Sequence, residues 1–249
     1  VSIKVEESEE DKWASRGAHK LLGALAAFDV DMNGRILDAG ASTGGFTDVC
    51  LEYGAQEVLS VDVGYGQLLW RLQNDDRVKV LDRTNIRNLT LEVTDGPCDG
   101  MVGDLSFISL RLVLPAIVEC LKDGAWLLPM VKPQFEVGRA RLGRRGVVTD
   151  PAARADAITG VLERAADAIA RDRAKAVVNG IVARRFPGVT VAPVTDCIID
   201  AASAGEIITI ARDSVGGVQP ATVELVVDIA SRPESVQCIA ENGLVLLGR

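Results

Sequence analysis

A glycine-rich turn between Ile36 and Phe46 is the stretch of this chain whose residue types best suit a nucleoside ligand. An apolar run ends at Asp38, glycines follow, and a helical pattern begins near Phe46. Glycines have no Cβ, so the backbone can come close to a ligand. Asp62, which ends the next apolar run, could accept hydrogen bonds from ribose hydroxyls. The spacing is not G-x-G-x-x-G, and a carboxylate before the turn suits a cation better than a pyrophosphate, so the pattern predicts a site for S-adenosylmethionine.

Two lysines and one aspartate are the residues best placed to move a proton. Lys132 ends an apolar run and precedes a proline, so we expect it to be partly removed from water, which favours a neutral amine that acts as a general base. Lys20 lies in a glycine-containing turn that enters a helix, and Asp104 ends another apolar run. A carboxylate near both lysines could hold them and align a substrate hydroxyl. The alternative is that both lysines are ordinary surface charges with an aspartate beside them.

Alternating strands and helices must position these residues. The apolar periodicity predicts strands at 35–39, 57–62, 78–81, 100–104 and 125–131, and helices at 44–53, 66–73 and 109–122. Such alternation indicates an α/β fold, a mostly parallel twisted sheet with helices on both faces. Ligands of these sheets bind at the carboxyl ends of the strands. The residues predicted at those ends are Asp38, Asp62, Asp82, Asp104 and Lys132.

The C-terminal third has a less regular pattern. A helix is predicted at 151–172, with Asp150 as its cap and Pro151 at its first position. A strand is predicted at 176–183, and the rest indicates a β-rich segment with apolar runs at 188–193, 206–211, 222–229 and 244–247. At the other end of the chain, 1–5 could be a strand and 6–11 an acidic linker.

The formal net charge of −8 argues at first against a nucleic-acid partner, but the charge is unevenly distributed. The acidic excess is concentrated after residue 188, whereas the segment 132–145 carries five basic residues and one acidic residue. A local basic loop can contact phosphates on a protein that is acidic overall. The predicted RNA-binding residues are Arg16, Arg139, Arg141, Arg144 and Arg145.

Five scattered cysteines, none spaced C-x-x-C, predict reduced thiols with neither a zinc site nor a disulfide framework. The chain has no apolar run of membrane-spanning length and no secretory signal pattern, so we expect a cytoplasmic protein.

Five motifs in order along residues 13–183 resemble the hemolysin-A-type (TlyA) ribosomal RNA 2′-O-methyltransferases, which have an FtsJ-like methyltransferase domain of Rossmann-like fold. The motifs are Ser15-Arg16-Gly17-Ala18-His19-Lys20-Leu21, Leu37-Asp38-Ala39-Gly40-Ala41-Ser42-Thr43-Gly44-Gly45-Phe46-Thr47, Val61-Asp62-Val63-Gly64-Tyr65-Gly66-Gln67-Leu68, Asp104-Leu105-Ser106-Phe107-Ile108-Ser109-Leu110 and Val131-Lys132-Pro133-Gln134-Phe135-Glu136.

The resemblance implies a catalytic Lys-Asp-Lys-Glu tetrad whose first three members fall on Lys20, Asp104 and Lys132. Lys132 would take the proton of the 2′-hydroxyl, while Lys20 and Asp104 would orient the ribose. The methyl donor would be S-adenosyl-L-methionine. The resemblance implies cofactor contacts at Asp38, Gly40, Ser42, Thr43, Gly44, Gly45, Phe46, Asp62 and Asp82.

The chain departs from the family pattern at both ends. The family's N-terminal RNA-binding S4 domain is expected to survive only as a remnant at 1–14, followed by a methyltransferase domain at 15–211 and a divergent tail at 212–249. Glu206, Glu224 or neither could supply the fourth tetrad member. The change in pattern after Ala183 motivates the hypothesis of an altered reading frame or a foreign extension.

These features predict a methyltransferase that modifies ribose 2′-hydroxyls of ribosomal RNA in ribosomal subunits, without a membrane partner. One alternative is a catalytically impaired remnant that binds the cofactor or the ribosome. A membrane-lytic hemolysin and a nicotinamide dehydrogenase fit the sequence less well. His19 is a candidate RNA contact or merely a solvated helix start. Tyr65, Phe107 and Phe135 could stack on bases, although we expect Phe107 to pack in the core.

Overall fold

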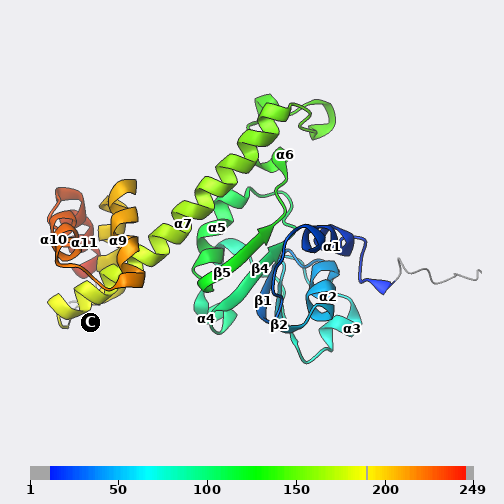
Figure 1. Ribbon diagram of the computed structural model, residues 1–249, viewed down its shortest axis with the longest axis horizontal. Helices are drawn as coiled ribbons and strands as arrows, with labels where there is room; N and C mark the ends of the chain where they lie inside the picture. The colour runs from blue at the N-terminus through cyan, green and yellow to red at the C-terminus, as the bar shows by residue number, and fades with distance from the viewer. Residues whose placement is uncertain (1–11, 189, 245–249) are drawn as a thin grey trace, which may run out of the picture. The chain divides into compact units, whose positions relative to one another are not determined.

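The computed structural model describes residues 12–188 and 190–244 (Figure 1). The strand and acidic linker predicted within 1–11 lie outside the described residues, as does nearly all of the run at 244–247. The chain forms two compact units, of which the first ends at Leu162 and the second begins at Glu163. The domain boundaries predicted at residues 14 and 211 stay predictions.

A five-stranded parallel sheet forms the centre of the first unit. It consists of β1 (Gly34–Ala39), β2 (Ala55–Val61), β3 (Val78–Leu81), β4 (Cys98–Gly103) and β5 (Leu121–Pro129), in the order β3-β2-β1-β4-β5. The predicted α/β class and the five predicted strands are confirmed. The chain runs outward from β1 through β2 to β3 and then crosses to β4, so the strand order reverses between β1 and β4. A ligand crevice is expected at the carboxyl ends of strands at such a point.

Helices lie on both sides of this sheet (Figure 1). They are α1 (Ala18–Ala27), α2 (Gly45–Glu52), α3 (Trp70–Gln73), α4 (Leu91–Thr94), α5 (Leu110–Val118) and α6 (Pro133–Glu136), together with 3₁₀ turns at Ile86–Asn88, Arg139–Arg141 and Arg144–Gly146. The helix predicted at 66–73 is shorter than expected, because Leu69 is extended and its N–H bonds the carbonyl of Thr43 in the glycine turn.

The core between these layers is built by the apolar strand residues, which are fully buried because a parallel sheet is covered on both faces. Among them are Ile36, Leu37, Val58, Leu59, Met101 and Val102.

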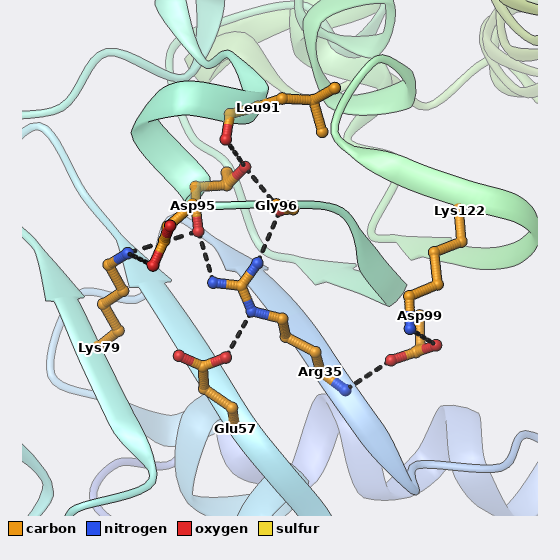
Figure 2. A network of polar contacts seen from close by, with 9 residues as sticks. Arg35, Glu57, Lys79, Leu91, Asp95, Gly96, Asp99 and Lys122 are labelled. Carbon is orange, nitrogen blue, oxygen red and sulfur yellow. Dashed lines mark hydrogen bonds and ion pairs between the residues drawn. The ribbon is translucent and has the colours of Figure 1, made fainter.

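A polar network around Arg35 joins the amino ends of the strands (Figure 2). The guanidinium of Arg35 pairs with Glu57 on β2 and donates to the Gly96 carbonyl at 2.6 Å, while the Arg35 N–H donates to Asp99 at 2.9 Å. Lys122 on β5 pairs with the same Asp99 at 2.6 Å. One arginine thus connects β1, β2 and the approach to β4, at the end of the sheet opposite Asp38 and Asp104.

The second unit is helical, which contradicts the β-rich pattern predicted for it. It contains the later part of α7 (Pro151–Arg185) and the whole of α8 (Val191–Ala201), α9 (Ala204–Gly216), α10 (Pro220–Ala230) and α11 (Pro233–Leu244). The strand predicted at 176–183 is wrong because α7 continues through it. The runs at 206–211 and 222–229 lie within α9 and α10, and 191–193 begin α8.

The β-branched residues of this unit favour strands, but their packing on one face of each helix outweighs that preference. In α9, Ile207 and Ile210 are buried at helical spacing, whereas Ile208 between them is half exposed. Ser203 and Glu206 form a capping box at the start of α9. A Ser followed three residues later by Glu is a helix signal, and it was present in the sequence.

A disulfide between Cys197 and Cys238 joins α8 to α11, with 5.7 Å between the two Cα atoms. The prediction of reduced thiols is wrong for this pair and holds for Cys50, Cys98 and Cys120, which are free and buried. The two bonded cysteines are 41 residues apart. Only the packing of α8 against α11 brings them together, so their spacing in the sequence does not predict the disulfide.

Candidate active site

Two lysines converge on one carboxylate at the carboxyl end of the sheet. Lys20 Nζ lies 2.7 Å from Asp104 Oδ2, and Lys132 Nζ lies 2.7 Å from Asp104 Oδ1. The predicted proximity of the three side chains is therefore confirmed.

Three separate elements bring these side chains together. Asp104 follows β4, and its N–H donates to the Ala39 carbonyl at the end of β1. Lys132 follows the neighbouring strand β5 and precedes α6, where Pro133 stands at the first helical position. Lys20 comes from the first turn of α1. Because β4 and β5 are parallel neighbours, their carboxyl ends place Asp104 and Lys132 side by side.

The cluster favours an ionised Asp104 between two lysines that differ in their exposure to water. Burial pushes the pKa of Asp104 upward, but hydrogen bonds and charges from Lys132 and Lys20 outweigh it and hold that pKa below its usual value. The side chain of Lys132 is 17% exposed and that of Lys20 is 46% exposed. Lys132 is thus the more desolvated of the two amines, as its position after an apolar strand predicted.

The glycine turn is held open by backbone conformations and by Asp62. Gly40 and Gly44 have φ of 86° and 98°, and Ser42 has φ of 49°. Asp62 accepts a hydrogen bond from Ser42 N–H at 2.8 Å and another from Gly64 N–H at 2.7 Å. A Cβ on Gly40 would lie 3.2 Å from Leu105 Cδ2 and 3.4 Å from the Asp104 carbonyl oxygen, so the turn passes directly against the backbone that follows β4.

A cavity of about 410 Å³ extends from this turn to the loop after Asp104. Four of the predicted site residues line it: Gly40, Ser42, Asp62 and Asp104. Sequence reasoning missed further lining residues, namely Gln67, Thr84, Asn85, Ile86 and Ser106. Gln67 and Ser106 lie inside two of the five family motifs. Thr84, Asn85 and Ile86 lie outside these motifs, and no sequence pattern marks them as site residues.

Several residues predicted to touch the cofactor are used in packing. Phe46 is buried in the core at 6% exposure. A Cβ on Gly44 would collide with Leu68 and Leu72, and one on Gly45 would collide with Ser15. Thr43 bonds Leu69 through its carbonyl, and Asp82 accepts a hydrogen bond from Gly66 N–H at 2.8 Å. These residues shape the loops around the cavity.

Asp38 is fully buried beneath the turn. Thr47 Oγ1 donates to its Oδ2 at 2.7 Å, while its Oδ1 has no hydrogen-bond partner among residues 12–188 and 190–244. Burial raises the pKa of Asp38 to about 7, although the hydrogen bonds from Thr47 oppose the shift. An unsatisfied buried oxygen of this kind is a feature that a ligand donor can complete.

Aromatic side chains stand exposed beside the cavity. Phe107 is 92% exposed with φ of 65°, so the expectation that it packs in the core is wrong. The turn after Asp104 directs it outward, where its ring lies 5.6 Å from that of Phe135. Tyr65 is also exposed, and the Arg83 guanidinium lies 4.3 Å from its ring centroid.

The predicted basic loop is exposed and folds into two 3₁₀ turns. Arg141 pairs with Asp156 at 2.7 Å and lies 3.8 Å from Asp150. Arg139, Arg144 and Arg145 are exposed in the same loop, and Arg16 is exposed just before α1. Arg141 therefore anchors the loop, while the other arginines present their charges to solvent.

The two candidates for a fourth tetrad member both belong to the helical unit. Glu206 is engaged there by Arg232 and by the cap of α9, and these contacts, with that of Arg232 foremost, lower its pKa to about 2. Glu224 lies on α10.

The sequence profile of the FtsJ-like methyltransferases matches residues 13–171. The chain belongs to the FtsJ-like methyltransferase family. It is 55% identical over 166 residues to the 16S/23S rRNA (cytidine-2′-O)-methyltransferase TlyA of Mycobacterium tuberculosis, covering 66% of this chain and 62% of that protein. It is 46% identical over 149 residues to the putative rRNA methyltransferase YqxC of Bacillus subtilis, covering 59% and 53%. The chain thus spans somewhat less than two thirds of the length of these curated relatives.

A solved structure described as a putative hemolysin from Streptococcus thermophilus is similar in fold, with a TM-score of 0.61 and 41% sequence identity over 66% of this chain and 59% of that one. The family and the fold expected from the five motifs are confirmed. Of the helices in the described residues, none has the length and apolar character needed to span a membrane.

Proposed function

We propose that this chain is an S-adenosylmethionine-dependent methyltransferase that modifies ribose 2′-hydroxyls of ribosomal RNA. The observation that carries this proposal is the pairing of Lys20 and Lys132 with Asp104 beside the glycine-bounded cavity. Membership of a methyltransferase family supports the reaction class. The similarity to an rRNA (cytidine-2′-O)-methyltransferase and to a putative rRNA methyltransferase supports the substrate.

The residues around the cavity fit S-adenosylmethionine. A volume of about 410 Å³ lies within the range of small-molecule sites. The carboxylate of Asp62 lines the cavity and gives it a negative character that suits a cation, and the buried Oδ1 of Asp38 has no hydrogen-bond partner among the described residues. We assign Gly40, Ser42 and Asp62 to direct contact and Asp38 to support from below. Thr43, Gly44, Gly45, Phe46 and Asp82 would hold the surrounding loops. When bound, the cofactor supplies an activated methyl group.

Proton removal from the ribose falls to Lys132 in this proposal. Its amine is the more desolvated of the two, and it must be neutral before it can accept a proton. Asp104 holds both amines through separate oxygens, which fixes the distance between them. Lys20, the more exposed amine, would donate a hydrogen bond to the ribose. Holding the hydroxyl in this geometry is the main contribution expected of the protein.

RNA binding would use exposed arginines and exposed aromatic rings, of which Phe107 lines the cavity. Arg16, Arg139, Arg144 and Arg145 are free to approach phosphates, while Arg141 holds the loop. The exposed rings of Phe107 and Tyr65 are suited to stacking on unpaired bases. Ribosomal subunits are the proposed partners, and the cytoplasm is the proposed location.

The test is methyl transfer from radiolabelled S-adenosylmethionine to separated ribosomal subunits. Lys132→Ala should reduce transfer by at least about 100-fold, the range of general-base catalysis, while cofactor affinity measured by calorimetry stays unchanged. Lys122→Ala is the matched control, because Lys122 pairs with Asp99 at the opposite end of the sheet. Unchanged transfer by the Lys132 variant would overturn the assignment of the base.

A cofactor-binding remnant without transfer activity is the second candidate. The engagement of Glu206 by Arg232 and by its own helix cap favours it, because these contacts occupy the Glu206 carboxylate within the helical unit. The same assay separates the two functions, since a remnant would bind the cofactor and leave every subunit unlabelled.

A further inference from the structure

The hydroxyl of Ser106 contacts the amine of Lys132, with Lys132 Nζ donating to Ser106 Oγ at 2.6 Å. Ser106 also lines the cavity beside Asp104. We propose that Ser106 is a positioning residue that holds the amine of Lys132 against Asp104. This inference rests on the proposed function, which makes Lys132 the base. The contact between Ser106 and Lys132 is observed independently of that proposal.

Three oxygen atoms lie close to the amine of Lys132. Its Nζ lies 2.7 Å from Asp104 Oδ1, 2.6 Å from Ser106 Oγ and 3.4 Å from the Asp104 carbonyl oxygen. An ammonium group has three N–H donors and no acceptor, whereas a neutral amine has two donors and one lone pair. The hydrogen bonds of Lys132 Nζ go to Ser106 Oγ and the Asp104 carbonyl oxygen, and its contact with Asp104 Oδ1 is an ion pair. A neutral Lys132 that keeps these two hydrogen bonds retains its lone pair for a hydroxyl proton. Without Ser106 the amine would be fixed by a single short contact.

The loop that carries Ser106 is tied to the segment that carries Lys132. Glu136, which ends α6, accepts hydrogen bonds from Ser109 Oγ at 2.6 Å and from Leu110 N–H at 2.7 Å at the start of α5. At the other end of the loop, Asp104 N–H bonds the Ala39 carbonyl. Because the loop is fixed at both ends and α6 is joined to α5, Ser106 and Lys132 are held as a pair.

Lys20 provides a reference inside the same cluster. It shares Asp104 with Lys132 and donates to the other carboxylate oxygen, Oδ2, at 2.7 Å. A change that acts through Ser106 should therefore alter Lys132 and leave Lys20 nearly as it was. A general loosening of the site should alter both lysines.

The first test needs no RNA and no catalysis. The whole chain and its Ser106→Ala and Ser106→Thr variants are labelled with limiting acetic anhydride, and the rate at each lysine is read by mass spectrometry. Ser106→Ala should raise the rate at Lys132 at least about threefold with less than twofold change at Lys20, and Ser106→Thr, which keeps the hydroxyl, should restore it. An unchanged rate at Lys132, or equal changes at both lysines, overturns the inference.

The second test is methyl transfer by the same variants. Ser106→Ala should lower kcat about tenfold or more, as expected for losing a hydrogen bond to a charged group, with KM for the cofactor within about twofold. Ser106→Thr should recover most of the rate. Equal kcat in the wild type and Ser106→Ala contradicts the inference. A wild type that transfers no methyl contradicts the proposed function instead, and the acetylation rates still decide the role of Ser106.

Discussion

Two carboxylates at neighbouring strand ends, Asp38 and Asp104, have pKa values shifted in opposite directions. Burial acts on both, but Asp104 has two cationic partners, whereas Asp38 has the neutral hydroxyl of Thr47. The pKa of Asp104 is therefore lowered, and that of Asp38 is raised to about 7. Environments that separate the pKa values of nearby acids are typical of functional sites.

Asp38 should make the stability of the first unit depend on pH. Its pKa is about 7 in the folded protein and 3.8 in an unfolded chain, so the fold binds this proton more tightly. The contribution of Asp38 to the free energy of unfolding is fully present below about pH 4 and is lost as the pH rises through 7. Between pH 4.5 and 7.5 the free energy of unfolding of the wild type should fall by on the order of 1–4 kcal/mol relative to Asp38→Asn.

Urea denaturation followed by tryptophan fluorescence measures this difference, since Trp13, Trp70 and Trp126 all belong to the first unit. The Asn variant is a suitable reference because it resembles a protonated Asp38 and does not titrate. Parallel pH dependence of the two proteins would show that Asp38 ionises normally in the fold.

The residues of the candidate site were predictable where a residue type and a strand end coincided. Asp104 and Lys132 each end an apolar run, so their meeting followed from the parallel sheet alone. Lys20 needed the family resemblance, because nothing in a helix start shows which strand it faces. Ser106 and Asn85 could not be predicted, since their side chains reach the cavity only through turn geometry that spacing does not encode.

The packing of α1 against α2 is the element-scale feature that places Lys20. Gly45 begins α2, and a Cβ there would lie 2.4 Å from Ser15 Oγ and 3.0 Å from the Ala18 N atom. The absence of a side chain at Gly45 therefore lets the first turn of α1 lie against the glycine turn. Lys20 stands two residues further along that helix.

Gly45→Ala should displace the first turn of α1 and with it Lys20. The expected cost is about 1–3 kcal/mol of stability, as for overpacking in a core, together with at least a tenfold loss of methyl transfer. Thermal denaturation and the subunit-labelling assay measure the two effects. Gly23→Ala is the control in the same helix, because its Cβ would meet nothing within 4 Å. It should gain about 0.5–1 kcal/mol through helix propensity and keep its activity.

At this scale the sheet was predictable and the C-terminal helices were not. Each strand of the first unit contains an apolar segment that ends at a glycine, a proline or an acidic residue, and few other structures fit that pattern. In α9 and α10, consecutive Ile and Val residues satisfy strand and helix periodicities alike. The capping box of Ser203 and Glu206 was the signal that could have decided between them.

At the scale of the whole molecule, the chain combines a unit that matches the FtsJ-like methyltransferase family with a helical unit that has its own core. Buried residues of that core include Val178, Ile198, Ile207 and Ile229. The family profile ends at residue 171, within α7, so the resemblance that identifies the first unit says nothing of α8 to α11. The hypothesis of an altered reading frame for the tail stays a prediction.

Reduction of the Cys197–Cys238 disulfide should destabilise the helical unit selectively. The bond closes a loop with a sequence separation of 41 residues, for which a loss of about 2–4 kcal/mol is expected. A reducing agent should lower the temperature at which part of the helical circular dichroism is lost. The midpoint seen by tryptophan fluorescence, which reports on the first unit, should stay within about 1–2 °C, well below the shift that such a loss would cause in a small domain.

The Cys197→Ser, Cys238→Ser double variant is the control, since it should melt like the reduced wild type and ignore the reducing agent. Equal shifts in the dichroism and fluorescence midpoints would contradict the assignment of the effect to the helical unit.

The network around Arg35 has a consequence for directed evolution of this protein. It joins the amino ends of the same strands whose carboxyl ends carry Asp38 and Asp104. Random libraries that select for heat tolerance can therefore be confined to residues at the amino ends of the strands. Libraries that select for new substrates can be confined to the loops at the carboxyl ends. Because the two sets of positions are separated by the length of a strand, improvements selected in one library should combine with those from the other with little interference.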